Sequence, residues 1–233
     1  MIMNVFAALS IIICAIASTT CAEGKIYVFY PTTARPQAVQ ERLQNALGDL
    51  TVTVFGRQGD FQEKMNSDPP DAIITKPALI DGYFDYSVAL SGVRKGTPNE
   101  KYVLVSIGKP LEPLQVNGET VIGAIDLFGR NGMRSFVSQF FPVEPKIRRV
   151  TKIEDLLPLL SFDMADGVIV EEVFMDYFRA TSHMDFTVTP LAALKSGIVA
   201  LCIRKNGKVG NTIEVLKGSD RSIGSLFEVD LWK

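Results

Sequence analysis

This 233-residue chain contains two units in which short apolar runs alternate with stretches of helical periodicity. Few folds accommodate such a pattern. In the first unit, predominantly apolar runs are separated by stretches in which apolar residues recur every three or four positions. The runs lie at 25–30, 50–55 and 71–75, and the helical patterns at 34–47 and 60–65. Strands that alternate with helices in this way form a parallel sheet covered by helices on both faces.

A second unit of the same kind begins after a change of character. Residues 86–93 and 101–107 are extended and rich in β-formers, with a turn-prone stretch between them. An apolar strand at 197–204 leads back out of the second unit, and the mixed pattern at 211–232 assigns no element. The second unit is expected to hold strands at 121–126, 146–150, 167–170 and 186–190, and helices at 133–141, 152–160 and 171–180. We therefore predict an α/β protein of two lobes, each a mostly parallel sheet flanked by helices, with a hinge.

The first 22 residues predict the compartment. They carry no Lys, Arg, Asp or Glu, and their apolar run from Val5 to Ala17 is broken only by Ser10. Small residues follow, as in the cleavage region of a secretory signal peptide, although no basic residue precedes the run. We expect cleavage after Ala22 and a periplasmic mature protein; lipoprotein anchoring at Cys21 is disfavoured because the usual upstream Leu is missing.

Composition and motifs exclude several classes of function. The net charge is −2, with both signs scattered, so no nucleic-acid footprint is present. Without the signal segment, Cys202 is the only cysteine and reads as a buried apolar residue. His183 is the only histidine and lies in a polar stretch without a nucleophile motif. We expect no enzyme activity, no cofactor and no metal.

Four segments, taken in order, carry a resemblance to a known superfamily. They are KIYVFYPTTARPQAVQERL from residue 25, SDPPDAIITKP from 67, NGETVIGAIDLFGRNGMRSFVSQF from 117 and KIEDLLPLLSFDMADGVIVEEVFMDYF from 152. The chain resembles the type II periplasmic solute-binding proteins, and within them the phosphate/phosphonate-type substrate-binding components of ABC transporters. It departs from that group at FGRNG, where the group often has a Ser/Thr-rich loop.

The resemblance implies an organisation and a mechanism. Lobe one would comprise residues 23–108 and 197–233, and lobe two residues 109–196. A small, anionic solute would bind between the lobes, at the carboxyl ends of the parallel strands, and the hinge would close around it. The closed monomer would then be presented to a membrane transporter permease or to a sensor protein, with no nucleic acid involved.

Polar residues near the expected strand ends are the candidate ligand contacts. The strongest group is the stretch 128–132, where two glycines permit a tight turn and Arg130 can hold a carboxylate or phosphate through two parallel hydrogen bonds. A solvent-exposed loop is the alternative interpretation of this stretch. The full set is Tyr30, Thr32, Thr33, Arg57, Thr75, Lys76, Gly129, Arg130, Asn131, Ser135 and Glu171.

Several of these residues have structural alternatives. Thr33 can cap the helix expected from Ala34, and Arg57 can belong to a surface turn. Lys76 can pair with an anion, whereas Glu171 can either bind a ligand amine or favour the start of the helix after it. Two rival functions also remain open: an enzyme on the same fold, and an interaction module that binds no ligand, since 211 mature residues are few for this superfamily.

Overall fold

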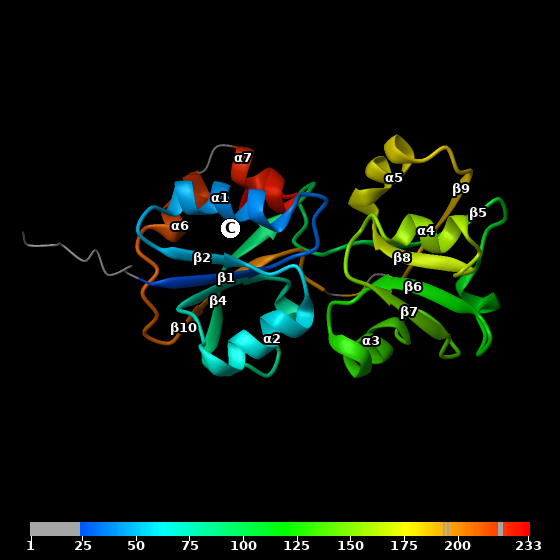
Figure 1. Cartoon of the computed structure of the whole chain (residues 1–233), viewed down its shortest axis with the longest axis horizontal. Helices are drawn as coiled ribbons and strands as arrows, with labels where there is room; N and C mark the ends of the chain where they lie inside the picture. Colours follow the sequence, from blue (N-terminus) through cyan, green and yellow to red (C-terminus); the bar gives the residue numbers. More distant parts are fainter. Residues whose placement is uncertain (1–23, 193, 195, 219–220) are drawn as a thin grey trace, which may run out of the picture.

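The computed structural model describes residues 24–192, 194, 196–218 and 221–233 and places them in two lobes (Figure 1). The expected signal segment at 1–22 and its cleavage site lie outside the described residues. Each lobe is built on a sheet of its own, with six strands in lobe one and five in lobe two. None of the helices in the described part of the chain is long and apolar enough to cross a membrane.

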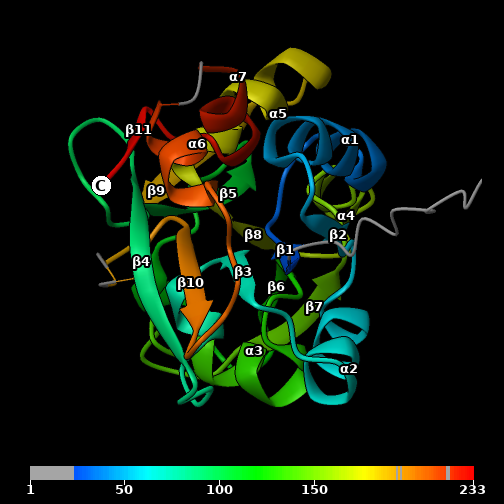
Figure 2. The same ribbon diagram turned by 90° about the vertical axis from the view of Figure 1, so that its left-hand side faces the viewer.

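The sheet of lobe one is mixed. Figure 2 views the molecule from the side on which lobe one lies. Its strands are β1 (Lys25–Phe29), β2 (Thr51–Val54), β3 (Ala72–Thr75), β4 (Tyr86–Val93), β10 (Ala200–Arg204) and β11 (Leu231–Trp232). They lie in the order β11-β4-β10-β3-β1-β2. β3, β1 and β2 run parallel, as the alternating pattern predicts. β10 returns from lobe two and enters between β3 and β4, antiparallel to both.

Helices cover both faces of this sheet because its central strands are apolar on both sides. They are α1 (Pro36–Leu47), α2 (Gln58–Ser67), α6 (Thr212–Gly218) and α7 (Arg221–Gly224), with short 3₁₀ turns at Pro77–Leu79 and Ser225–Phe227. α1, α6 and α7 lie on one face and α2 on the other (Figure 1). The apolar stripe predicted for α1, formed by Val39, Leu43 and Leu47, is buried against the sheet.

Lobe two has a similar layered structure. Its strands are β5 (Tyr102–Ile107), β6 (Val121–Ile125), β7 (Lys146–Val150), β8 (Gly167–Glu171) and β9 (Phe186–Pro190), in the order β7-β6-β8-β5-β9. Its helices are α3 (Gly129–Val137), α4 (Leu156–Ser161) and α5 (Met175–Thr181), with 3₁₀ turns at Pro113–Gln115 and Glu172–Phe174. β7, β6 and β8 run parallel, and one apolar core joins the sheet to these helices.

The boundary between the lobes lies before residue 102, earlier in the chain than the sequence predicts. β5 pairs with β8 and β9, so residues 102–107 belong to lobe two, and the boundary at residue 108 is wrong. The apolar pattern of β5 fits the core of either lobe, and only its pairing decides between them. The chain therefore crosses at 94–101 and returns at 191–199. The two crossing segments are joined by hydrogen bonds from Glu100 N to Ser196 O, 2.7 Å, and from Ile198 N to Pro98 O, 2.9 Å.

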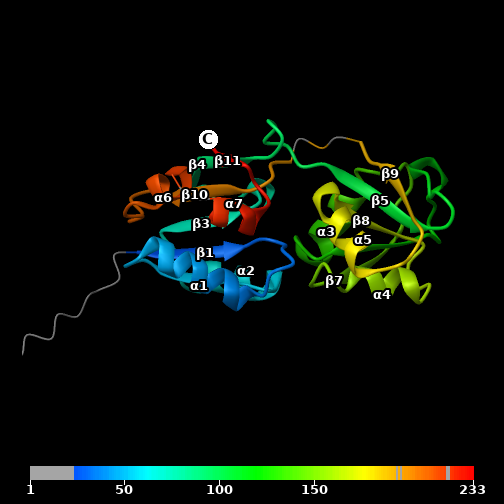
Figure 3. The same ribbon diagram turned by 90° about the horizontal axis from the view of Figure 1, so that it is seen from above.

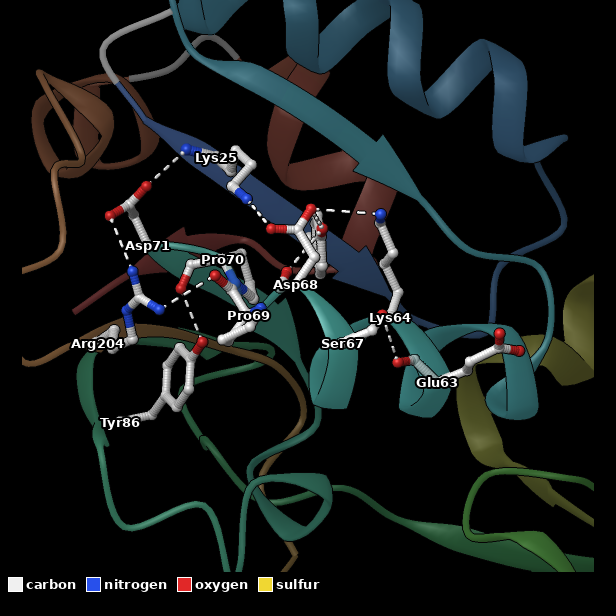
Figure 4. A network of polar contacts seen from close by, with 11 residues as sticks. Lys25, Glu63, Lys64, Ser67, Asp68, Pro69, Pro70, Asp71, Tyr86 and Arg204 are labelled. Carbon is white, nitrogen blue, oxygen red and sulfur yellow. Dashed lines mark hydrogen bonds and ion pairs between the residues drawn. The ribbon is translucent and has the colours of Figure 1, made fainter.

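The end of lobe one that faces away from lobe two is held by a polar network (Figure 4). The Asp68 carboxylate, at the end of α2, forms ion pairs with Lys25 and with Lys64, the latter at 3.3 Å. Oδ2 of Asp71 accepts a hydrogen bond from the backbone N of Lys25 at 2.9 Å, and its Oδ1 lies 3.6 Å from Nη2 of Arg204. These contacts tie together the starts of β1 and β3, at the opposite end of the sheet from lobe two.

Candidate functional site: a charged cluster between the lobes

The parallel strands of both lobes end at the gap between the lobes. Figure 3 shows β1 pointing from lobe one toward lobe two. β3 runs parallel to β1, so Lys76, the residue after β3, emerges at this gap. Glu171 is the last residue of β8 and emerges from the opposite side. Loops at the carboxyl ends of parallel strands are where open α/β sheets bind ligands.

Lys76 and Glu171 form an ion pair between the two lobes. Nζ of Lys76 lies 3.1 Å from Oε1 of Glu171 and 3.3 Å from Oε2 of Glu100, which belongs to the first crossing segment. The side chains of Lys76, Glu100 and Glu171 are 2%, 1% and 3% exposed. Charges buried to this degree are tolerated only when they are paired, because losing their hydration costs several kcal/mol.

Two aromatic rings complete the surroundings of the Lys76 ammonium. Its nitrogen lies 5.2 Å from the ring centroid of Tyr30, in lobe one, and 5.8 Å from that of Tyr102, in lobe two. Both distances fall within the range of cation–π attraction. The ammonium also donates to the carbonyl oxygen of Ile198 at 3.5 Å. Lobe one, lobe two and the crossing segments therefore all contact one cation.

Arg94 adds a second cation and makes the group electrically neutral. Its Nη1 lies 2.8 Å from Oε1 of Glu100, and its Nε donates to the carbonyl oxygen of Glu228 in the C-terminal tail. Glu100 thus bridges the two cations. We name Tyr30, Lys76, Arg94, Glu100, Tyr102 and Glu171 the interlobe cluster. It contains two cations and two carboxylates, so their formal charges cancel.

Burial controls the ionisation of this cluster. Burial alone lowers the pKa of Lys76, but Tyr102, Glu171, Tyr30 and Glu100 around it raise that pKa well above its ordinary value. Burial raises the pKa of Tyr102 to about 12 and also raises the pKa of Tyr30. At neutral pH the cluster therefore consists of an ammonium, a guanidinium and two uncharged phenols facing the carboxyl groups.

Two polar atoms of the cluster have no hydrogen-bond partner among the described residues. Neither the Tyr30 hydroxyl nor Nη2 of Arg94 makes a hydrogen bond of normal geometry within the described residues, although the two groups interact electrostatically. Both atoms are buried. A buried donor without a partner costs about 1–3 kcal/mol, so a small polar group that paired with these atoms would bind favourably.

A small pocket beside the cluster gathers three of the predicted contacts. Its volume is about 110 Å³, and residues of both lobes line it. Tyr30, Thr32 and Thr33 contribute from lobe one, and the segment 151–154 from lobe two. Thr33 makes no side-chain cap, because α1 begins at Pro36 with Arg35 as its N-cap. Residues 151–154 were missed, although their position directly after a predicted strand is the signal that pointed to Lys76.

Thr75 does not reach either lobe's ligand-facing surface. Its side chain is fully buried, and its hydroxyl donates to the carbonyl oxygen of Phe29 at 2.6 Å, between β3 and β1. The Thr75 hydroxyl therefore serves the sheet of lobe one in this structure, and a ligand contact at Thr75 stays a prediction.

The stretch FGRNG is the first turn of a helix and not a free loop. α3 begins at Gly129, four residues before the predicted start, and Gly129 takes a left-handed φ of +69°. A side chain at Gly129 would lie 3.4 Å from Oε1 of Gln58 in lobe one, so this turn faces α2. Arg130, Asn131 and Ser135 are exposed on α3.

Neither Arg130 nor Arg57 is among the residues that contact the interlobe cluster. Arg130 lines a separate pocket of about 520 Å³ that only lobe-two residues form, together with Arg134, Lys146 and Arg149. Arg57 is the exposed N-cap residue of α2. The strongest sequence candidate is thus not brought together with Lys76 and Glu171, because the helical turn directs Arg130 elsewhere.

A larger pocket of about 930 Å³ lies on the side of the first crossing segment. It shares Arg94 and Glu100 with the interlobe cluster and extends to Glu172 and Arg179 of lobe two and Glu228 of lobe one. Sequence reasoning missed it, because it forms only where the crossing segment, the C-terminal tail and α5 meet. The signal was weak: Arg94 directly follows the predicted strand 86–93.

Comparison with known proteins adds evidence on the fold. No protein-family model matches the sequence, and no curated protein matches it. An amino acid ABC transporter substrate-binding protein from Streptococcus pneumoniae, bound to L-arginine, matches with a TM-score of 0.58 and 16% identity, over 88% of this chain and 94% of that chain. The GluR0 ligand-binding core from Nostoc punctiforme, in complex with L-glutamate, gives 0.58 and 10%, over 87% and 97%.

A third solved structure has a different context. It is the periplasmic VFT2 domain of BvgS from Bordetella pertussis, with a TM-score of 0.54 and 14% identity, over 86% of this chain and 92% of that chain. All three structures cover both lobes, and at such identities the likeness establishes the fold alone. The predicted two-lobed α/β architecture is thereby confirmed, and it is the fold of the type II periplasmic solute-binding proteins. The expectation that each sheet is mostly parallel is wrong: both sheets are mixed, because β4, β10 and β11 in lobe one and β5 in lobe two pair antiparallel with their neighbours.

Proposed function

We propose that this chain is an extracytoplasmic solute-binding protein. It would capture a small solute between its lobes by hinge closure and present the closed form to a membrane transporter permease or a sensor protein. The fold supports this proposal, as do the uncharged apolar N-terminal segment and the absence of a nucleophile or metal motif from the sequence. Fold alone does not fix function, so the remaining support for this function must come from the residues of the site.

The observation that carries the proposal is the opposition of Lys76 and Glu171. They stand at strand ends on opposite lobes, 3.1 Å apart in this structure. When the lobes part, lobe one presents a cation and lobe two a carboxylate to the incoming solute. A solute with both an anionic group and an amine complements that pair. The solved structures named above hold L-arginine and L-glutamate, which have both groups.

A zwitterion is therefore our first choice of solute, with its anionic group on Lys76. Phosphate and phosphonates remain the second class, from the sequence resemblance, but no named neighbour holds either of them. The pocket beside the cluster, at about 110 Å³, is smaller than the ~300–1,000 Å³ of ordinary ligand sites. Entry of a solute into this small pocket therefore requires the lobes to open, whereas the larger pocket of about 930 Å³ beside Arg94 and Glu100 is already of ligand size.

A thermal-shift screen tests the proposal. Mature protein, unfolded and refolded to release bound molecules, is screened with amino acids, carboxylates, phosphate and phosphonates, and each hit is titrated by calorimetry. Lys76→Met should weaken the binding of a true hit by about 10- to 150-fold, since a charge-assisted hydrogen bond contributes ~1.5–3 kcal/mol. Arg130→Ala is the comparison variant and should leave the affinity unchanged.

Two outcomes would redirect the assignment. Loss of affinity in Arg130→Ala but not in Lys76→Met would move the site to the start of α3. Conversion of a hit to product would favour an enzyme. A chain that binds no solute is the second candidate function, which the small pocket and the neutral cluster support, and a screen without any hit would favour it.

A further inference from the structure

The Lys76 ammonium has the surroundings of a bound ligand. Two carboxylates, two aromatic faces and one carbonyl oxygen contact it, at the distances given above. Lys76 is the only member of this group that belongs to β3 and its following turn. The other contacts come from the end of β1, from both crossing segments and from lobe two.

We propose that the gap between the lobes contains an ammonium-binding site that the chain fills with its own Lys76. In this state the lysine acts as a tethered ligand and holds the lobes together without a solute. The inference goes beyond the proposed function, because it concerns the solute-free chain and holds whether or not a solute is later found.

Charge balance within the site supports the proposal. Among the described residues, Glu100 has a second cation in Arg94, whereas the one ion pair of Glu171 is with Lys76. Burial raises the pKa of Glu171 and Lys76 opposes that rise, so truncating Lys76 leaves the Glu171 carboxyl group buried without its counter-charge. It also leaves a space that two tyrosine rings flank. Such a space favours a cation of the size that was removed.

Chemical rescue tests the site directly. Lys76→Ala removes three methylene groups and the ammonium, and n-propylammonium consists of three carbons and an ammonium. At about 100 times its dissociation constant, n-propylammonium should raise the Tm of Lys76→Ala by roughly 5–10 °C. Propan-1-ol, of equal size but uncharged, should not. The wild type and Lys76→Met should gain nothing, because a side chain already fills the space.

A second substitution identifies the partner. In Lys76→Ala combined with Glu171→Gln, the rescue by n-propylammonium should weaken at least tenfold. If Lys76→Ala does not fold in buffer, n-propylammonium should restore its folded circular dichroism spectrum, and failure to do so contradicts the proposal. An equal response to propan-1-ol and n-propylammonium would also overturn it.

The tethering role has a separate test in a variant that keeps Lys76. Glu171→Gln leaves the ammonium with Glu100 but removes its charged partner on lobe two. Hydrogen exchange in the crossing segments 94–101 and 191–199 should then accelerate at least tenfold in the solute-free protein. Unchanged exchange would show that the pair does not hold the lobes together. A solute screen without hits would refute the proposed function and leave these amine and exchange results untouched.

Discussion

At the scale of residues, the informative feature is the pairing of the charged side chains in the gap between the lobes. Position in the sequence marks Lys76 and Glu171 as residues that follow buried strands and can meet a ligand. The structure pairs them with each other across 95 positions of sequence. That pairing depends on how the two lobes sit relative to each other, which no local pattern encodes. Arg130 was favoured because glycines flank it, but those glycines begin a helix.

The free energy of the Lys76–Glu171 pair is measurable by a double-mutant cycle. Lys76→Met leaves Glu171 buried without a counter-charge and should lower the free energy of unfolding by about 3–5 kcal/mol. Lys76→Met combined with Glu171→Gln should recover most of that loss, because the orphaned charge is gone. Urea unfolding of the wild type, of Lys76→Met, of Glu171→Gln and of the double variant gives the values that the cycle needs.

A surface lysine provides the control for that cycle. Lys146 is exposed and pairs with the exposed Glu119, so Lys146→Met should change the free energy of unfolding by about 0.5 kcal/mol or less. If Lys76→Met cost no more than Lys146→Met, the cluster would not contribute to the stability of the fold.

At the scale of elements, the alternating pattern predicts almost every strand, and the ends of helices less well. β4 and β9 occupy the predicted residues, since both segments are rich in β-branched and aromatic residues that favour extended structure. α3 begins four residues early because Gly129 can take a positive φ, which the sequence permits but does not require. The membership of β5 in lobe two depends on pairing with β8 and β9, and its own residues carry no sign of that choice.

The network at the end of α2 makes an acid-dependent prediction. Hydrogen bonds from Lys25 and Lys64 lower the pKa of Asp68 to about 2. A carboxyl group whose pKa is lower in the folded state stabilises fully above its unfolded value, near 4, and loses that contribution as the pH falls toward 2. Asp68→Asn should therefore flatten the loss of stability between about pH 4 and pH 2. The midpoint of urea unfolding as a function of pH reports this.

An exposed aspartate outside the network is the control for Asp68. Asp163→Asn should leave the loss of stability at acid pH as steep as in the wild type, since Asp163 is exposed and forms no ion pair among the described residues. If both variants lost stability at acid pH as steeply as the wild type, Lys25 and Lys64 would not hold Asp68 ionised in solution.

At the scale of the whole molecule, the sequence predicts two lobes, their order along the chain and the return of the C-terminal part to lobe one. All three are present. The candidate site was predicted in part: Tyr30, Thr32 and Thr33 meet residues of lobe two, and Lys76 meets Glu171. Arg94, Glu100 and Tyr102 were missed, because the crossing segment becomes part of the site only when both lobes are in place.

The separation of the lobes tests the central claim most directly. Small-angle X-ray scattering of the refolded, solute-free protein compares the wild type with Glu171→Gln. We predict that the wild-type profile matches the closed structure and that the radius of gyration of Glu171→Gln is larger, because lobe two has lost its ionic contact with Lys76. A hit from the solute screen should close Glu171→Gln only at concentrations well above those that bind the wild type, because Glu171 is the proposed contact for the solute's amine. Identical profiles for the wild type and Glu171→Gln, unchanged by any solute, would contradict a hinge that closes through this cluster.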